Sequence, residues 1–134
     1  MFNHIVIGSN DLQRAKVFYD AVLATLGVEN AVVNALPTGP KRLFYRHAGM
    51  SFIVTEPLNG EPATAANGAT VAFRCNSPEQ VLHFHAVALT NGGASIEDAP
   101  GLRQNPVVGD IFAAYVTDSD GNKLCATHRL APHS

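Results

Sequence analysis

The sequence has few cysteines and no paired-cysteine motif. Only Cys75 and Cys125 occur, and a zinc site made of thiolates needs closely spaced pairs, so such a site is excluded. Both residues fall in segments that we expect to be strands, where a thiol acts as a small buried hydrophobic group. Reduced cysteines are typical of a cytosolic chain. We therefore expect a cytoplasmic protein.

Long apolar runs and an excess of positive charge are missing as well. No apolar stretch approaches the roughly 18 residues that suggest a membrane span, and the N-terminal residues lack the basic region of a signal peptide. The formal net charge is −2, whereas nucleic-acid recognition requires a basic surface. We therefore expect neither a membrane nor a nucleic acid as a partner.

What the chain does contain is an internal repeat. The strand-like segment 70–76 begins 66 residues after the segment 4–10, and the same offset aligns Phe18 with Phe84 without a gap. A repeat at a fixed period usually reflects one supersecondary unit used more than once. Two copies are too few for a solenoid, so we predict a single domain of two modules. The predicted domain is 1–134. Its two modules are 1–56 and 69–130, and the linker between them is 57–68.

Each module is predicted to contain a strand, a helix and three further strands. Ser9 or Asn10 can cap the first helix, and Gly27 supplies its left-handed end. The second helix has clearer signals for its start, with Ser77 as the cap and Pro78 at the first helical position. The segment 97–110 is predicted to be a loop. The predicted strands are 2–8, 28–33, 42–46 and 51–55, then 70–76, 94–96, 111–117 and 123–128.

Two motifs carry a resemblance to a known superfamily. One is the helix pattern Asp11-Leu12, Phe18-Tyr19 and Leu26-Gly27, and the other is the hairpin at 117–124, Thr-Asp-Ser-Asp-Gly-Asn-Lys-Leu. With two βαβββ units, the chain resembles the vicinal oxygen chelate superfamily, which contains glyoxalase I, extradiol dioxygenases, methylmalonyl-CoA epimerase, and fosfomycin and bleomycin resistance proteins. The resemblance covers essentially the whole chain. It implies an α+β fold in which the modules form a half-open, barrel-like mixed sheet with the helices on its outer face.

The resemblance also implies a divalent metal in the active members, held by the first and last strands of each module. Aligning the two halves puts His4, Ile53, Thr70 and Cys125 at the four ligand positions. Isoleucine cannot coordinate a metal, and a threonine hydroxyl is a poor ligand. Glu56 is the nearest replacement, but strand alternation puts it on the opposite face from Ile53. We therefore predict no specifically bound metal and no other cofactor.

Strand alternation also predicts the wall of a concave cavity. His4, Thr70 and Arg74 would lie on the same side as Cys125, and we place Tyr115 and Arg103 beside them. A mixed wall of this kind suits a modest organic ligand better than acid–base catalysis. The predicted ligand-binding residues are His4, Thr70, Arg74, Arg103, Tyr115 and Cys125, and no catalytic residue is predicted.

Two kinds of function remain open at this point. The first is a binding protein that has lost most of the metal site, in the manner of resistance proteins that sequester a drug between two subunits. The second is a metal-dependent lyase, isomerase or dioxygenase with an atypical site, similar to lactoylglutathione lyase or to the dioxygenases. A degenerate domain kept as a subunit of something larger is a third reading. The lost ligands favour the binding protein, and the resemblance implies a homodimer.

Overall fold

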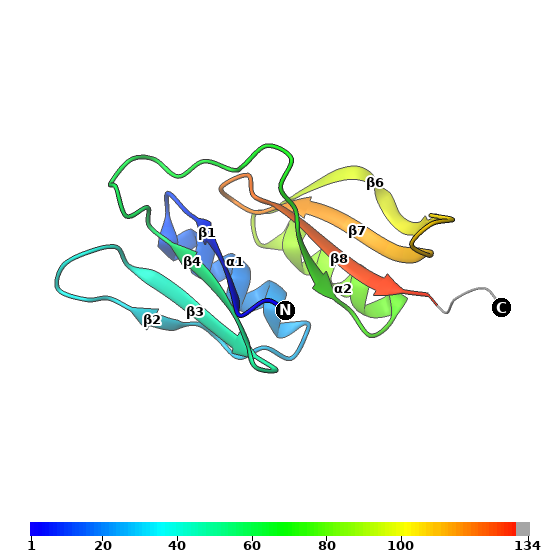
Figure 1. Ribbon diagram of the computed structural model, residues 1–134, viewed down its shortest axis with the longest axis horizontal. Helices are drawn as coiled ribbons and strands as arrows, with labels where there is room; N and C mark the ends of the chain where they lie inside the picture. The colour runs from blue at the N-terminus through cyan, green and yellow to red at the C-terminus, as the bar shows by residue number, and fades with distance from the viewer. Residues whose placement is uncertain (131–134) are drawn as a thin grey trace.

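The computed structural model describes residues 1–130, which form two sheets of four strands and two helices (Figure 1). The strands and the helix of the first module are β1 (His4–Gly8), α1 (Leu12–Ala24), β2 (Val32–Asn34), β3 (Arg42–His47) and β4 (Met50–Thr55). Those of the second module are β5 (Val71–Arg74), α2 (Pro78–Thr90), β6 (Ala94–Arg103), β7 (Ile111–Thr117) and β8 (Lys123–Arg129).

Both modules have the same strand order. The first sheet has the order β1-β4-β3-β2, and the second has β5-β8-β7-β6. In each sheet the first strand pairs in parallel with the last strand of its module, and the remaining pairs are antiparallel. The predicted pair of βαβββ modules and the α+β class are therefore confirmed.

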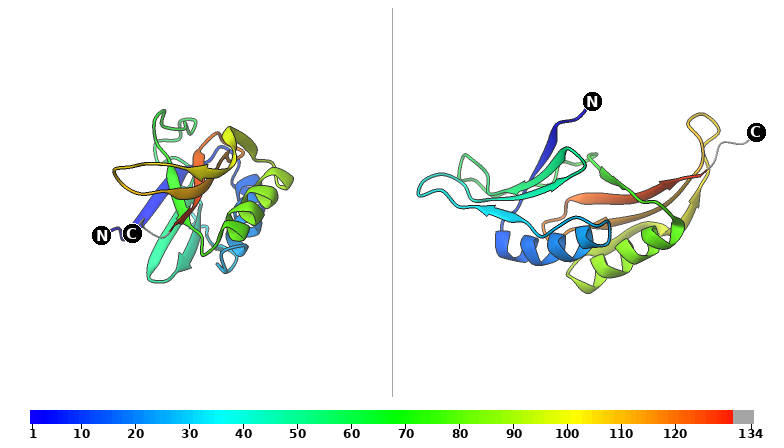
Figure 2. Two further views of the ribbon diagram at one scale, coloured as in Figure 1. Left: turned by 90° about the vertical axis from the view of Figure 1, so that its right-hand side faces the viewer. Right: turned by 90° about the horizontal axis from the view of Figure 1, so that it is seen from below.

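The two helices pack side by side and cover one face of each sheet, as the right-hand view of Figure 2 shows. The other face of each sheet is open, so the sheets do not close into a barrel. A series of aromatic rings runs through the core from one module to the other. Ring centroids are 5.1 Å apart for Tyr19 and Phe52, 5.3 Å for Phe52 and Phe73, and 5.8 Å for Phe73 and Phe84. The modules therefore share one core.

The helix caps follow the sequence signals with one correction. Ser77 caps α2 and Pro78 is its first residue, as predicted. The cap of α1 is Asp11, not Ser9 or Asn10, because the Asp11 carboxylate accepts a hydrogen bond from the backbone of Arg14 at 3.1 Å. Ser9 instead accepts one from the backbone of Asp11. Within residues 1–130, neither helix is long and apolar enough to cross a membrane.

Most predicted strand boundaries agree with the structure to within two residues, and two differ by more. Of the segment 28–33 only the last two residues belong to a strand, β2, and the predicted loop at 97–110 begins too early, because β6 continues to Arg103. The pairing of β6 with β7 shifts between Ile96 and Gly101, which leaves extra residues on β6. The Arg103 guanidinium donates hydrogen bonds to three backbone carbonyls of this bulge. Local hydrogen bonds of the Arg103 side chain thus accompany the continuation of the strand past the irregularity.

The segment 57–68 between the modules contains no helix or strand. It is fixed near its midpoint by two hydrogen bonds with the Asn10 side chain. The Asn10 amide nitrogen donates to the Ala63 carbonyl at 3.0 Å, and the Ala63 backbone nitrogen donates to the Asn10 amide oxygen at 2.7 Å. The linker therefore lies against the start of α1.

Candidate functional site

The open faces of the two sheets present equivalent rows of side chains. Residues paired across neighbouring strands lie on the same face of a sheet, so the register defines each row. The first sheet carries Val6, Ile53, Phe44 and Val32, and the second carries Ala72, Cys125, Tyr115 and Ile96. The second module thus has a thiol and a phenol where the first has an aliphatic and a phenyl side chain. In this central row the polar groups therefore lie on the second sheet alone.

A cavity of about 510 Å³ lies over the open face of the second sheet. Four of the six predicted ligand-binding residues line it: Thr70, Arg103, Tyr115 and Cys125. Arg74 borders an adjoining hollow on the same face, which shares Ala72, Ile111, Thr127 and Arg129 with this cavity. His4 lies on the first sheet and lines neither of them. The structure thus gathers five of the six predicted residues along one sheet.

Tyr115 and Cys125 form the centre of this face. They are direct cross-strand neighbours. Burial raises the pKa of the Cys125 thiol above its usual value, although the neighbouring Tyr115 hydroxyl opposes the shift. Burial, together with Cys125, also raises the pKa of Tyr115. Both groups are therefore neutral near pH 7, and the thiol is not activated as a nucleophile.

Cations surround the Tyr115 ring. The Arg103 guanidinium carbon lies 5.7 Å from the ring centroid and the Lys123 amine 5.1 Å, within the range of cation–π interactions. Lys123 also forms an ion pair with Glu97. The cavity is lined by Arg103, Lys123 and Arg129 against one carboxylate, Glu97. The local surface is therefore positive on a chain whose net charge is −2, which favours an anionic group on a ligand.

Lys123, Arg129 and Glu97 are not among the predicted residues. The first two could have been found by extending the alternation from Cys125, because residues two and four apart on a strand share a face. Glu97 could not, because it belongs to the bulge of β6 and has a positive φ of 59°. A regular strand would not have indicated its position.

The residues at the four inherited metal positions do not converge. His4 is exposed on the first sheet, where its Nδ1 is 2.6 Å from the Asn3 side-chain oxygen, whereas Cys125 lies on the second sheet. The Glu56 carboxylate accepts a hydrogen bond from the backbone of Lys41. No group of three or more His, Cys, Asp or Glu side chains within residues 1–130 is placed to hold a metal. Within one chain these side chains are therefore not gathered around a common point.

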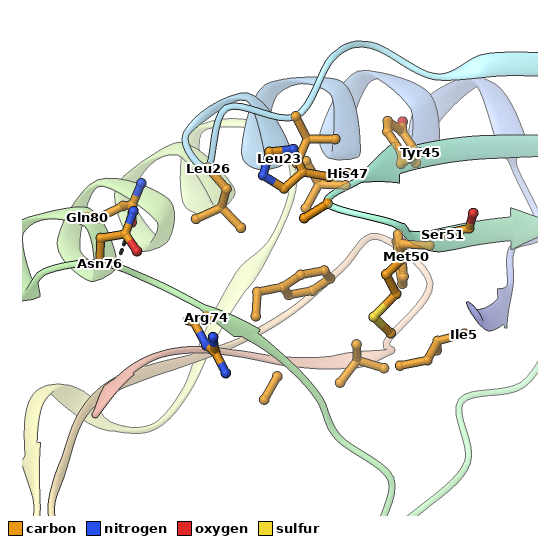
Figure 3. A pocket seen from close by; sticks show the side chains of 16 residues that line it. Ile5, Leu23, Leu26, Tyr45, His47, Met50, Ser51, Arg74, Asn76 and Gln80 are labelled. Atoms are coloured by element: carbon orange, nitrogen blue, oxygen red, sulfur yellow. Dashed lines mark hydrogen bonds between the residues drawn. The ribbon is translucent and has the colours of Figure 1, made fainter. Parts of the chain in front are cut away.

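A different cavity, of about 470 Å³, lies between the two modules. It is lined by the end of α1, the β3–β4 hairpin, β5 and the start of α2 (Figure 3). Of the six predicted residues only Arg74 reaches it. Sequence reasoning misses this cavity because it depends on how the modules pack together.

Comparison with known proteins gives a consistent picture. No protein-family model matches the chain, and no curated protein matches it. Among solved structures, a glyoxalase/bleomycin resistance protein from Albidiferax ferrireducens is 47% identical, with a TM-score of 0.88, over 96% of this chain and 99% of that one.

Two more distant structures share the fold. The fosfomycin resistance protein FosX from Listeria monocytogenes is 17% identical, with a TM-score of 0.67, over 100% of this chain and 94% of that one. A lactoylglutathione lyase from Agrobacterium tumefaciens is 18% identical, with a TM-score of 0.64, over 96% and 92%.

Proposed function

The chain belongs to the glyoxalase/bleomycin resistance family of the vicinal oxygen chelate superfamily, and from this we propose that it binds a small organic ligand over the open face of its second sheet. The observation that carries the proposal is that Thr70, Arg103, Tyr115 and Cys125 line one cavity of about 510 Å³. This volume lies within the range of about 300–1,000 Å³ that is usual for ligand sites.

We propose that binding at this site needs no metal. The positions that would hold the ion carry one imidazole, one isoleucine, one threonine and one thiol with a raised pKa. Such a ligand set is poorly suited to coordinate magnesium, manganese or nickel. The polar groups that remain can orient a ligand: hydroxyls from Thr70 and Tyr115 and positive charge from Arg103.

The partner in this proposal is a second copy of the chain. The open face of the first sheet exposes an apolar row in which Val6 is 48% exposed and Val32 is 70% exposed. Burying such a row in a dimer is favourable because apolar surface leaves water. Analytical ultracentrifugation checks this: a dimer is expected, and Val32→Glu with Val6→Glu should yield monomers. A monomeric wild-type protein at micromolar concentration would contradict it.

A cytoplasmic location is part of the same proposal, since both thiols are free and persist in a reducing compartment. Fractionation of cells that express the protein at its natural level tests it directly.

The experiment for the ligand site is a thermal-shift screen of small organic acids, with and without divalent ions and EDTA. Stabilisation by a small molecule that is unaffected by EDTA supports the proposal. Stabilisation that requires a divalent ion supports the alternative, a metal-dependent lyase, isomerase or dioxygenase.

A pair of variants locates the site. Cys125→Phe places a bulky group in the cavity and should abolish the ligand-induced shift. Ile53→Phe makes a similar change at the equivalent position of the first sheet, where the side chain is also buried, and should leave the shift in place. The reverse pattern would put the ligand over the first sheet and overturn the assignment.

A further inference from the structure

The two ends of the molecule differ although the modules repeat. β1 and β5 lie near the centre of the molecule and run in opposite directions (Figure 1), so the turn of each module faces the strand–helix junction of the other. At one end the β7–β8 turn docks onto the β1–α1 junction. Asp120 accepts a hydrogen bond from the Asn10 backbone at 2.8 Å, and the Asn122 amide donates to the Gly8 carbonyl at 3.0 Å. That end is closed.

At the other end the corresponding turn is too short to dock in this way. The β3–β4 hairpin turns through Ala48 and Gly49 alone, with φ values of 51° and 80°. This is the two-residue turn that matches strand twist, and it carries no carboxylate. The junction that it faces is formed by Arg74 and Asn76, which lie 66 residues after Gly8 and Asn10. The space between them is the cavity of about 470 Å³.

The wall of this inter-module cavity is largely apolar. It comes from both modules, and its main members are Leu26, Val28, Met50, Phe52, Val71 and Phe73. None of the lining residues is acidic. The Gln80 amide is already used, because its oxygen accepts from the Asn76 backbone at 2.6 Å and its nitrogen donates to the Thr25 carbonyl at 2.9 Å. Gln80 therefore forms a fixed polar wall.

Arg74 and Asn76 place polar groups at one end of the cavity. Figure 3 shows Arg74, Asn76 and Gln80 at one end, and Met50 and Ile5 at the other. Within residues 1–130, the Arg74 guanidinium and the Asn76 side-chain amide have no hydrogen-bond or ion-pair partner, and neither has the imidazole of His47 on the cavity wall. A guanidinium with free donors beside an apolar chamber suits a carboxylate that carries a hydrocarbon tail.

We propose that the inter-module cavity is a second binding site, for a small amphipathic carboxylate of the medium-chain fatty-acid type. The carboxylate pairs with Arg74 and Asn76, and the hydrocarbon tail lies toward Met50 and Phe52. The site exists because the β3–β4 turn lacks the docking side chains of its counterpart in the second module. Its lining shares only Ala72 with that of the cavity that contains Cys125, and it does not depend on the function proposed for that cavity.

The test is a titration of the full-length ¹⁵N-labelled protein with sodium octanoate, followed by amide chemical shifts. Saturable shifts are expected around Ala48, Phe73 and Asn76, with a dissociation constant below about 1 mM. Octanamide, which is neutral and of the same length, should bind at least about tenfold more weakly, because it lacks the charge that pairs with Arg74.

Two variants and a control complete the experiment. Arg74→Gln, at an exposed side chain, should weaken octanoate binding by about tenfold or more, and Met50→Trp should abolish it by filling the chamber. Arg14→Gln removes a similar charge from an exposed position of α1 that lines neither of the two cavities, and it should have no effect.

Several results would overturn the inference. Shifts confined to the amides around Tyr115 and Cys125 would move the ligand to the face of the second sheet, and would leave the proposed function standing. Equal affinities for octanoate and octanamide, or no saturable shift at about 1 mM, would remove the second site altogether.

Discussion

The hydroxyl of Tyr19, in the first module, donates a 2.5 Å hydrogen bond to the carboxylate of Asp118, in the second. Both side chains are buried. The same carboxylate accepts hydrogen bonds from the backbones of Asp120 and Asn122 and from the Asn122 side chain. One carboxylate therefore shapes the β7–β8 turn and also ties that turn to α1. Burial and the Asp118 charge together raise the pKa of Tyr19 well above its usual value, so the phenol remains a donor.

We expect Tyr19→Phe to destabilise the protein by about 1.5–3 kcal/mol, the usual range for a hydrogen bond to a charged group. Asp118→Asn should cost at least as much, because an amide cannot accept all of these hydrogen bonds with both ends. Urea denaturation gives the free energies of unfolding. Asp98→Asn, at an exposed carboxylate, is the control and should change little. Equal stability of Tyr19→Phe and wild type would show that the bond adds nothing.

The ionisation of Asp20 should make the free energy of unfolding depend on pH. Burial alone would raise the pKa of its carboxyl, but hydrogen bonds from Lys16, the Ala31 backbone and Tyr45 outweigh burial and lower it. The ionised form is therefore favoured in the folded state. The stabilisation is present above the unfolded pKa of about 3.9, and is lost as the pH falls through the lower pKa of the folded state.

The expected result for Asp20→Asn is a flatter dependence of the unfolding free energy on pH below about pH 5. Urea titrations at several pH values measure it, with Asp98→Asn again as the control. Parallel curves for Asp20→Asn and wild type would mean that the carboxylate has no preferential partner in the folded protein.

Gly27 and Gly93 occupy the same repeat position, but the structure needs them for different reasons. Gly27 has a φ of 82° and open space where a Cβ would lie. A Cβ on Gly93 would lie 2.8 Å from the Ala88 carbonyl oxygen and 2.9 Å from that of Thr117. Gly93→Ala should therefore cost about 1–3 kcal/mol through overpacking.

Gly27→Asn is the matched comparison, because asparagine tolerates the left-handed conformation. It should cost clearly less than Gly93→Ala when both are measured by thermal or urea unfolding. A Gly93→Ala protein as stable as wild type would show that the two backbones can move apart at no cost.

The thiols offer a chemical readout of the cavity over the second sheet, which Cys125 lines. Burial raises the pKa of Cys75 to about 11 and that of Cys125 above its ordinary value, and the nearby Glu97 charge adds to the latter shift. Thiolates are the reactive form, so native alkylation by iodoacetamide at pH 8 should be slow at both. Glu97→Gln should speed it at Cys125 alone, with Cys75 as the internal control. Mass spectrometry of timed samples measures both rates, and an unchanged or slower rate at Cys125 would argue against the charge effect.

The sequence predicts the module architecture because its signals are local or periodic. A helix cap such as Ser77 and a five-residue turn after Thr117 can be recognised from the sequence alone. The fixed offset then relates the two halves. The end of α2 departs from the offset, because Gly92, with a φ of 98°, takes the left-handed conformation that Gly27 has after α1. Alignment by offset alone gives that conformation to Gly93.

The features that sequence reasoning misses depend on an irregular strand and on how the modules pack. In β6 the Arg103 side chain donates to the carbonyls of a bulge two to five residues earlier, which no period predicts. The inter-module cavity depends on where a two-residue turn ends relative to Arg74. Cys125, Tyr115 and Thr70, by contrast, lie on regular strands or next to them, so alternation sufficed to group them.

The attachment of Ala63 to Asn10 has a consequence for how the halves of one molecule stay together. A tether pinned near its middle acts as two short spans instead of one slack loop, and short spans keep the joined parts at a high effective concentration. Exchange of a whole module between two molecules would first have to release both hydrogen bonds of the Asn10 amide. The two hydrogen bonds of the Asn10 side chain thus favour pairing of the two modules within one chain over their exchange between chains.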